Sequence, residues 1–267
     1  AGFRWICLDR TTKRGIPNKL FIDSNGNGRL DDDPAVSGDV SAYAAIFDPA
    51  RVVFQTEDGP VTYHVIVRYY QYDRVYVSSA CWYEGDVDFG GKKYRVRLVD
   101  SNVNGAFDDI GWDTADTDRL ILSPNKATET DQRIDRYLGR LVEVDGQLFR
   151  IEVARDGAFV KVEKARDIKF GTVTVPETIS EFTAAGPTGH FTRNPSNGSF
   201  TLPAGNYQIL SWTIERKDNK GATWQLVGDD FGANGRFALG VDQSVRFDIG
   251  EPVLSILEVT EAKSAKD

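Results

Sequence analysis

The chain has 267 residues and carries a formal net charge of −8 at pH 7, which argues against binding to the phosphate backbone of nucleic acids. Its length allows two or three domains, and its hydrophobic content of 40% is enough to build their cores. No run of about 18 apolar residues occurs, so the sequence predicts no membrane-spanning helix.

Apolar residues alternate with polar ones along most of the chain, and this period of two is typical of β-strands. The expected fold class is all-β, with several modules of β-sandwich or β-barrel-like form and calcium-binding loops inserted between strands. Only residues 130–138 suggest a short helix. Strands are predicted at 3–8, 19–22, 61–70, 74–83, 93–99, 119–122, 147–153, 158–162, 169–175, 207–216, 223–227, 245–249 and 253–259.

Three domains are expected. The first covers residues 1–82 and carries one predicted calcium loop, and the second covers 83–165 and carries another. The sequence changes character near 164–167, so residues 166–267 are predicted to form a separate β-sandwich domain.

The two predicted calcium loops share one pattern. The stretch at 20–32 reads LFIDSNGNGRLDD, and the stretch at 97–109 reads RLVDSNVNGAFDD. Their first aspartates, Asp23 and Asp100, are 77 residues apart. One copy alone is equally well explained as a turn rich in Asn and Gly, but the repetition favours calcium.

Calcium prefers six to eight oxygen ligands, and alternate side chains of a short loop can supply them. Gly28 and Gly105 occupy the sixth position, where the chain must turn sharply. The seventh position supplies a main-chain carbonyl, and the eighth holds an apolar residue. The predicted ligands are Asp23, Asn25, Asn27, Arg29 (through its carbonyl), Asp31, Asp32 and Asp33 in the first loop, and Asp100, Asn102, Asn104, Ala106 (through its carbonyl), Asp108 and Asp109 in the second.

Both loops lack the bidentate Glu that closes an EF-hand at position 12, where this chain has Pro34 and Gly111. A carboxylate from another position must therefore close each site. The candidates are Asp32 or Asp33 in the first loop, and Asp109, Asp113, Asp116 or Asp118 in the second. A third stretch at 230–237 lacks a ligand at its third position and is predicted to be a plain turn.

The remaining polar and aromatic candidates carry less information. Cys7 and Cys81 either form a disulfide or remain free, and His64 and His190 have no partner histidine in their vicinity along the chain. Among the five tryptophans, Trp112 follows the second loop and is the best candidate for an exposed ring that contacts a glycan.

Two stretches resemble known families. Residues 198–209, GSFTLPAGNYQI, resemble the signature of prealbumin-like or carboxypeptidase-regulatory-like β-sandwich modules on secreted bacterial proteins. Residues 83–162 are similar to uncharacterised bacterial surface proteins that carry Asp-x-Asn-x-Asn-Gly loops of the EF-hand type. These resemblances imply extracellular β-domains that act as spacers or adhesive units, and they bring no catalytic residues.

No catalytic motif was found, so the chain is not expected to be an enzyme. The expected function is that of a calcium-stabilised structural or adhesive protein, outside the cell or on its surface, with the periplasm as another possible location. Its partners would be copies of itself or other surface proteins. The alternative is a carbohydrate-binding module or an accessory domain of a secreted hydrolase, with a polysaccharide as the partner.

Overall fold

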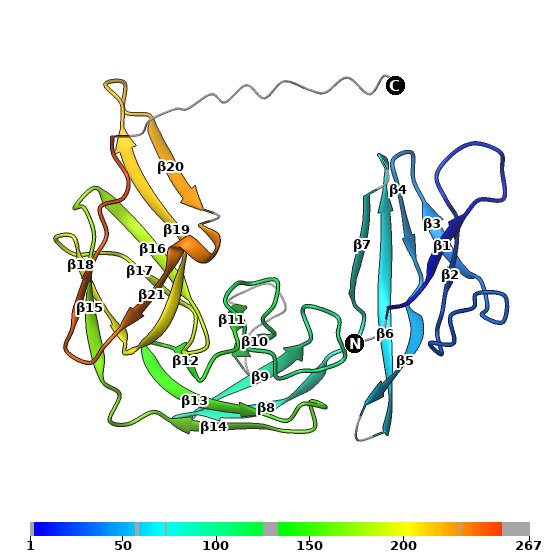
Figure 1. Cartoon of the computed structure of the whole chain (residues 1–267), viewed down its shortest axis with the longest axis horizontal. Coiled ribbons are helices and arrows are strands. Elements are labelled where there is room, and N and C mark those ends of the chain that lie inside the picture. The colour runs from blue at the N-terminus through cyan, green and yellow to red at the C-terminus, as the bar shows by residue number, and fades with distance from the viewer. Residues whose placement is uncertain (1–2, 57–58, 73, 125–132, 230, 253–267) are drawn as a thin grey trace, which may run out of the picture.

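The computed structural model describes residues 3–56, 59–72, 74–124, 133–229 and 231–252. The all-β prediction is confirmed, because nearly all of the regular structure is antiparallel sheet (Figure 1). Helical structure within the described residues is limited to one 3-10 turn, η1 (Gly232–Gly235), and no helix there is long and apolar enough to cross a membrane.

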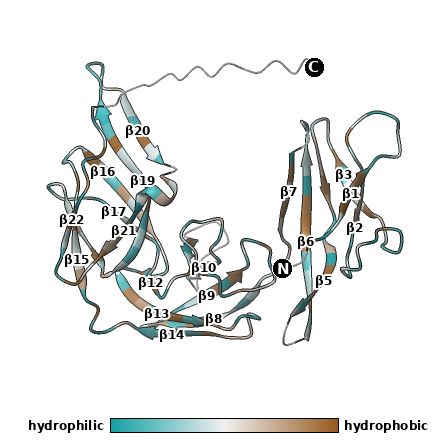
Figure 2. Cartoon of the chain, viewed as in Figure 1, coloured by the Kyte–Doolittle hydropathy of each residue, from teal (hydrophilic) through white to brown (hydrophobic). Residues whose placement is uncertain are grey.

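The N-terminal sheet has seven strands in the order β1-β2-β3-β4-β6-β5, with β7 paired to the other side of β6. Strand β6 is the longest of them, and its buried residues alternate with less buried ones. Figure 2 shows hydrophobic and hydrophilic residues along the strands of the chain. The strands are β1 (Ile6–Asp9), β2 (Lys19–Ile22), β3 (Val36–Val40), β4 (Ala44–Phe47), β5 (Ala50–Thr56), β6 (Gly59–Tyr70) and β7 (Arg74–Ser79).

The middle of the chain forms a four-stranded sheet, in the order β11-β10-β9-β8, and a three-stranded sheet, β12-β13-β14. A tight turn at 144–146 joins β12 to β13, and both Asp145 and Gly146 have positive φ, as such a hairpin requires. The strands are β8 (Tyr83–Phe89), β9 (Lys92–Val99), β10 (Arg119–Pro124), β11 (Ile134–Tyr137), β12 (Leu141–Val144), β13 (Gln147–Val153) and β14 (Val160–Lys164).

The C-terminal part contains a sheet β18-β15-β22 and a sheet β17-β16-β19-β20, with β21 also paired to β19. A Pro-Ala-Gly corner separates β18 from β19, and the buried hydroxyl of Tyr207 donates to the carbonyl of Pro203 at 2.7 Å across it. The strands are β15 (Phe170–Thr174), β16 (Ile179–Ala185), β17 (Phe191–Arg193), β18 (Ser199–Pro203), β19 (Gly205–Lys217), β20 (Thr223–Asp229), β21 (Arg236–Leu239) and β22 (Ser244–Arg246).

Two hydrophobic cores hold these sheets together. The first contains buried residues from Leu20 to Phe149, so it takes side chains from the N-terminal sheet and from the middle sheets alike. The second runs from Leu141 to Leu239. The predicted domain boundary at residue 82 therefore lies between the N-terminal sheet and the middle sheets, which share one hydrophobic core.

One predicted secondary-structure element needs correction. The short helix predicted over 130–138 is wrong where the structure describes it, because Ile134–Tyr137 forms strand β11. Cross-strand pairing with β10, from Arg119 opposite Tyr137 to Leu122 opposite Ile134, outweighs a weak local preference for helix. Cys7 and Cys81 are free thiols, one exposed and one half-buried. The strand predicted at 253–259 lies outside the described residues.

Candidate metal centres

Each predicted calcium loop begins where a strand leaves the core. The first loop joins β2 to β3, and the second joins β9 to β10. Buried residues alternate along these strands, and Asp100 continues the alternation of β9, whereas Asp23 directly follows the buried Ile22 and is buried as well. Asp23 is 1% exposed and Asp100 is 0% exposed. A buried carboxylate is costly unless hydrogen bonds or a cation compensate its charge.

In the first loop, three main-chain N–H groups surround the carboxylate of Asp23. Gly26 N and Asn27 N donate to Oδ1 at 2.7 and 3.0 Å, and Gly28 N donates to Oδ2 at 3.0 Å. Gly26 and Gly28 have φ values of 78° and 80°, which explains why glycine stands at both positions. The loop is therefore wrapped around the side chain of its own first residue.

The second loop repeats this arrangement around Asp100. Val103 N donates to Oδ1 at 2.7 Å, and Gly105 N donates to Oδ2 at 2.8 Å. Val103 occupies the position of Gly26 and has a φ of 61°, which is unusual for a β-branched residue. The same loop conformation is thus kept here despite an unfavourable residue.

The two asparagines of the first loop converge on a single carboxylate. Asn25 Nδ2 and Asn27 Nδ2 donate to Asp32 Oδ2 at 3.4 and 2.7 Å. Their side-chain oxygens accept main-chain N–H groups of the loop itself, those of Asn27 and Arg29. Side chains three, five and ten of the loop therefore gather at one place.

The second loop shows the same convergence. Asn102 Nδ2 and Asn104 Nδ2 donate to Asp109 Oδ2 at 2.9 and 2.7 Å, and Asn104 Oδ1 accepts from Ala106 N at 2.7 Å. Because Asp109 and Asp32 stand at the same position of the repeat, the sequence repeat is also a repeat in structure.

One further buried carboxylate closes each loop, and the two come from different sequence positions. Asp33 is 8% exposed and accepts from Ser24 N at 3.2 Å and from Ser24 Oγ, while its Oδ2 is buried without a hydrogen-bond partner. Asp118 is 0% exposed and accepts from Ser101 N at 2.9 Å. Ser24 and Ser101 are equivalent in the repeat, so Asp33 and Asp118 have equivalent places.

The second loop concentrates negative charge. The pKa of Asp118 is raised to about 7, mainly by burial and also by the nearby charges of Asp100 and Asp109, against the effect of its hydrogen bonds. Burial also raises the pKa of Asp100. Asp109 N donates to Asp118 Oδ2 at 3.0 Å. None of these three carboxylates has an ion-pair partner within the part of the chain that the structure describes.

The first loop has a cation beside it. Arg4 Nη1 lies 3.8 Å from Asp23 Oδ1, and the side chain of Arg4 is 19% exposed. The same guanidinium donates to the carbonyl of Asp23 at 3.1 Å and to that of Val53. Val53 N in turn donates to Ser24 O at 2.7 Å, which fixes the loop to β5.

Strand β5 lies between the two loops. Arg4 Cζ lies 5.5 Å from the ring centroid of Phe54. The same ring also packs closely against Gly105 of the second loop. A Cβ added to Gly105 would lie 3.1 Å from Cδ2 of Phe54. Phe107, the apolar eighth residue of the second loop, is buried against Tyr63 of β6 and Tyr83 of β8, with ring centroids 6.2 and 5.0 Å apart. The second loop is therefore part of the junction between two sheets.

Some predicted site residues lie away from the convergence. Asp31 forms an exposed ion pair with Arg29 at 2.6 Å, and Asp108 is exposed. Trp112 was expected to be exposed, but it is half-buried, and Arg236 Cζ lies 4.5 Å above its ring. In the third stretch, Gly232–Gly235 forms η1, and Asp230 lies outside the described residues.

No group of three or more His, Cys, Asp or Glu side chains with metal-holding geometry occurs among the described residues. The ligands expected in these loops also include asparagine side chains and main-chain carbonyls. Comparisons with protein families, with characterised proteins and with solved structures found no match to this chain.

Proposed function

We propose that the chain is a calcium-stabilised structural or adhesive protein of the cell surface or the extracellular space. The observation that carries this proposal is the repeated set of hydrogen bonds around Asp23 and Asp100. In each loop, two asparagines meet a carboxylate, and a second buried carboxylate, Asp33 or Asp118, closes the site. Such a set of oxygen donors suits a hard divalent cation.

The donor set favours calcium over zinc or copper, because the loops contain neither thiol nor imidazole groups. The buried Oδ2 of Asp33 has no partner within the described residues, and a bound cation would provide one. An asparagine side chain can present either its oxygen or its nitrogen after a half-turn. With calcium in the loop, we expect Asn25, Asn27, Asn102 and Asn104 to turn their oxygens inward.

An extracellular role follows from the expected affinity. Neither loop has the bidentate Glu at position 12, and extracellular calcium modules work at about 10⁻⁴ to 10⁻³ M. Thermal unfolding in calcium and after chelation tests the proposal. We expect the midpoint to fall with chelator and to recover with calcium but not with magnesium. An unchanged midpoint would refute the proposal.

Self-assembly is part of the proposal, because the N-terminal sheet has open edges. Strand β1 pairs with β2 on one side, and β7 pairs with β6 on one side, among the strands that the structure describes. On β7, Val75, Tyr76 and Val77 are 45%, 54% and 41% exposed. Exposed apolar edges favour pairing with another chain. Sedimentation at rising protein concentration should reveal assembly. A chain that stays monomeric at every concentration would refute the self-assembly part of the proposal.

Glycan binding is the second candidate function. The exposed fractions of Trp5, Trp82 and Trp224 are 53%, 51% and 42%, and exposed aromatic rings are suited to contact with sugars. Binding to a panel of polysaccharides, compared between the wild type and Trp-to-Ala variants at these three positions, would distinguish this role from a purely structural one.

A further inference from the structure

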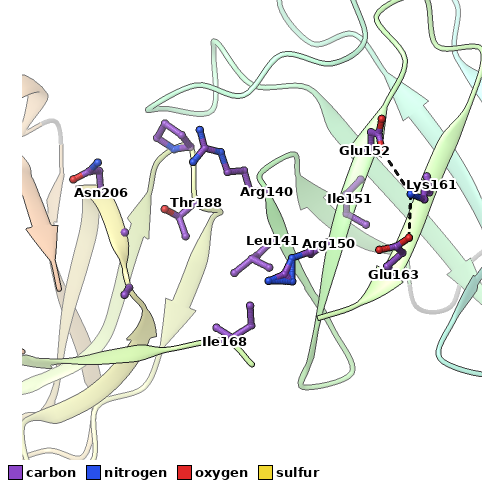
Figure 3. Close-up of a pocket in the computed structure, with 13 residues that line it drawn as sticks. Arg140, Leu141, Arg150, Ile151, Glu152, Lys161, Glu163, Ile168, Thr188 and Asn206 are labelled. Atoms are coloured by element: carbon purple, nitrogen blue, oxygen red, sulfur yellow. Dashed lines mark ion pairs between the residues drawn. The ribbon is translucent and has the colours of Figure 1, made fainter. Parts of the chain in front are cut away.

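A cleft of about 660 Å³ lies where the middle sheet β12-β13-β14 meets the C-terminal sheets (Figure 3). Main-chain hydrogen bonds join its two walls. Arg140 N donates to Pro187 O at 3.1 Å, and Leu141 N donates to Thr188 O at 2.9 Å. Because Leu141 is also buried in the second hydrophobic core, the two walls are fixed relative to each other.

The cleft contains two arginines without partners. The exposed side chains of Arg140 and Arg150 make no hydrogen bond or ion pair with any residue that the structure describes. Arg150 stands opposite Glu163 in the register of β13 and β14, but Glu163 pairs with Lys161 at 3.0 Å. Lys161 also approaches Glu152 at 3.9 Å. Both glutamates are thus engaged by the lysine, and the two guanidinium groups remain available.

The rest of the lining is partly apolar and partly polar. Figure 3 shows Leu141 between the two arginines, with Ile168 near it, and Thr188 and Asn206 on the C-terminal wall. None of the described residues that line the cleft is aromatic. Recognition here must therefore depend on ion pairs and hydrogen bonds more than on ring stacking.

We propose that this cleft binds an oligosaccharide that contains uronic acid. Guanidinium groups bind carboxylates through two parallel hydrogen bonds, so Arg140 and Arg150 would hold the acid groups. Thr188 and Asn206 would meet the hydroxyl groups, and Leu141 would contact the ring carbons. No cleft residue belongs to either calcium loop, so this site stands apart from the calcium-binding proposal.

The test uses the full chain with calcium held constant and a hyaluronan tetrasaccharide as the probe, measured by calorimetry. We expect binding that weakens with salt, and no binding of neutral chitotetraose. Arg140→Ala and Arg150→Ala should each weaken binding about tenfold, the loss of one charge-assisted contact. Arg150→Lys, which keeps the charge but loses the planar fork, should weaken it less.

Arg166→Ala is the matched control, because Arg166 is exposed, has no partner among the described residues and lies outside the cleft. Its affinity should equal that of the wild type. If Arg140→Ala and Arg150→Ala both bind the tetrasaccharide as tightly as the wild type does, the proposal is overturned. Tighter binding of an oligoglutamate peptide, or equally tight binding of free glucuronate or citrate, would also overturn it, because the site would then recognise a peptide or any small carboxylate.

Discussion

The two predicted calcium loops have nearly the same internal hydrogen bonds but different surroundings. Around Asp23 the loop is exposed, and Arg4 supplies a positive charge at 3.8 Å. Around Asp100 the loop is more deeply buried, and the charges of Asp100 and Asp109 act on Asp118, while none of these three carboxylates has an ion-pair partner in the described structure. A local sequence thus sets the shape of each loop, while residues distant in the sequence set the charge around it.

The largest expected effect concerns the second loop. Asp100→Asn should abolish calcium binding there and lower the free energy of unfolding by about 3 kcal/mol at calcium a hundred times above the dissociation constant. Differential scanning calorimetry with and without chelator measures this. Asp108→Asn, at an exposed position of the same loop, is the control and should leave the unfolding midpoint unchanged.

The closing carboxylate offers a sharper test of the same loop. Asp118→Asn should reduce the calcium affinity of the second loop at least tenfold, because it removes a charged group from the proposed site. In the sequence, Asp118 lies beyond the stretch that holds the other proposed ligands. Asp116→Asn, an exposed neighbour, should not reduce the affinity. If the two variants bind calcium equally well, Asp118 has no role in the site.

A smaller effect is expected in the first loop. Asp33→Asn should lower the free energy of unfolding in calcium by about 1–2 kcal/mol, less than Asp100→Asn, because Arg4 already compensates part of the charge. Asp31→Asn should have no measurable effect, since Asp31 pairs with Arg29 in solvent. A larger loss of unfolding free energy from Asp33→Asn than from Asp100→Asn would contradict the expected difference between the two loops.

Arg4 itself can be used to make the first loop resemble the second. Arg4→Gln should raise the calcium affinity of the first loop severalfold, because it removes a competing cation, and should destabilise the protein without metal. Arg4→Lys keeps the charge and should not raise the affinity. Calcium titration of each variant at constant ionic strength checks this, and a loss of affinity in Arg4→Gln would contradict it.

The last effect lies outside the loops and should not depend on calcium. Burial lowers the pKa of His190 from 6.5 to about 4, and its ring stacks on Tyr137 at 5.0 Å. The unfolded chain therefore binds the proton more readily between these values, so stability should fall as the pH drops from about 6.5 toward 4. Urea unfolding across this range should show a loss of at most about 3 kcal/mol, which His190→Phe reduces.

The sequence predicted the loops because their information is local. Six positions of the repeat carry it, and the strands before Asp23 and Asp100 alternate clearly. Strand β3 was missed because Gly38 and Asp39 interrupt its alternation, and β11 was mistaken for a helix because its partner strand lies elsewhere in the chain. Local pattern thus gave the fold class but missed several strands.

The features that distinguish the loops could not be predicted from local pattern. Asp118 follows Asp100 by eighteen residues, and only the pairing of β9 with β10 brings them together. Arg4 reaches Asp23 because β1 pairs with β2. The cleft likewise joins Arg140 and Arg150 to Thr188 and requires the tertiary fold.

The most direct test of the central claim is a calcium titration of the metal-free chain by isothermal calorimetry. We expect two bound ions in the wild type, one in Asp100→Asn and one in Asp23→Asn, with the tighter site lost in Asp100→Asn. A wild-type chain that binds no calcium at millimolar concentration, or variants that still bind two ions, would contradict it.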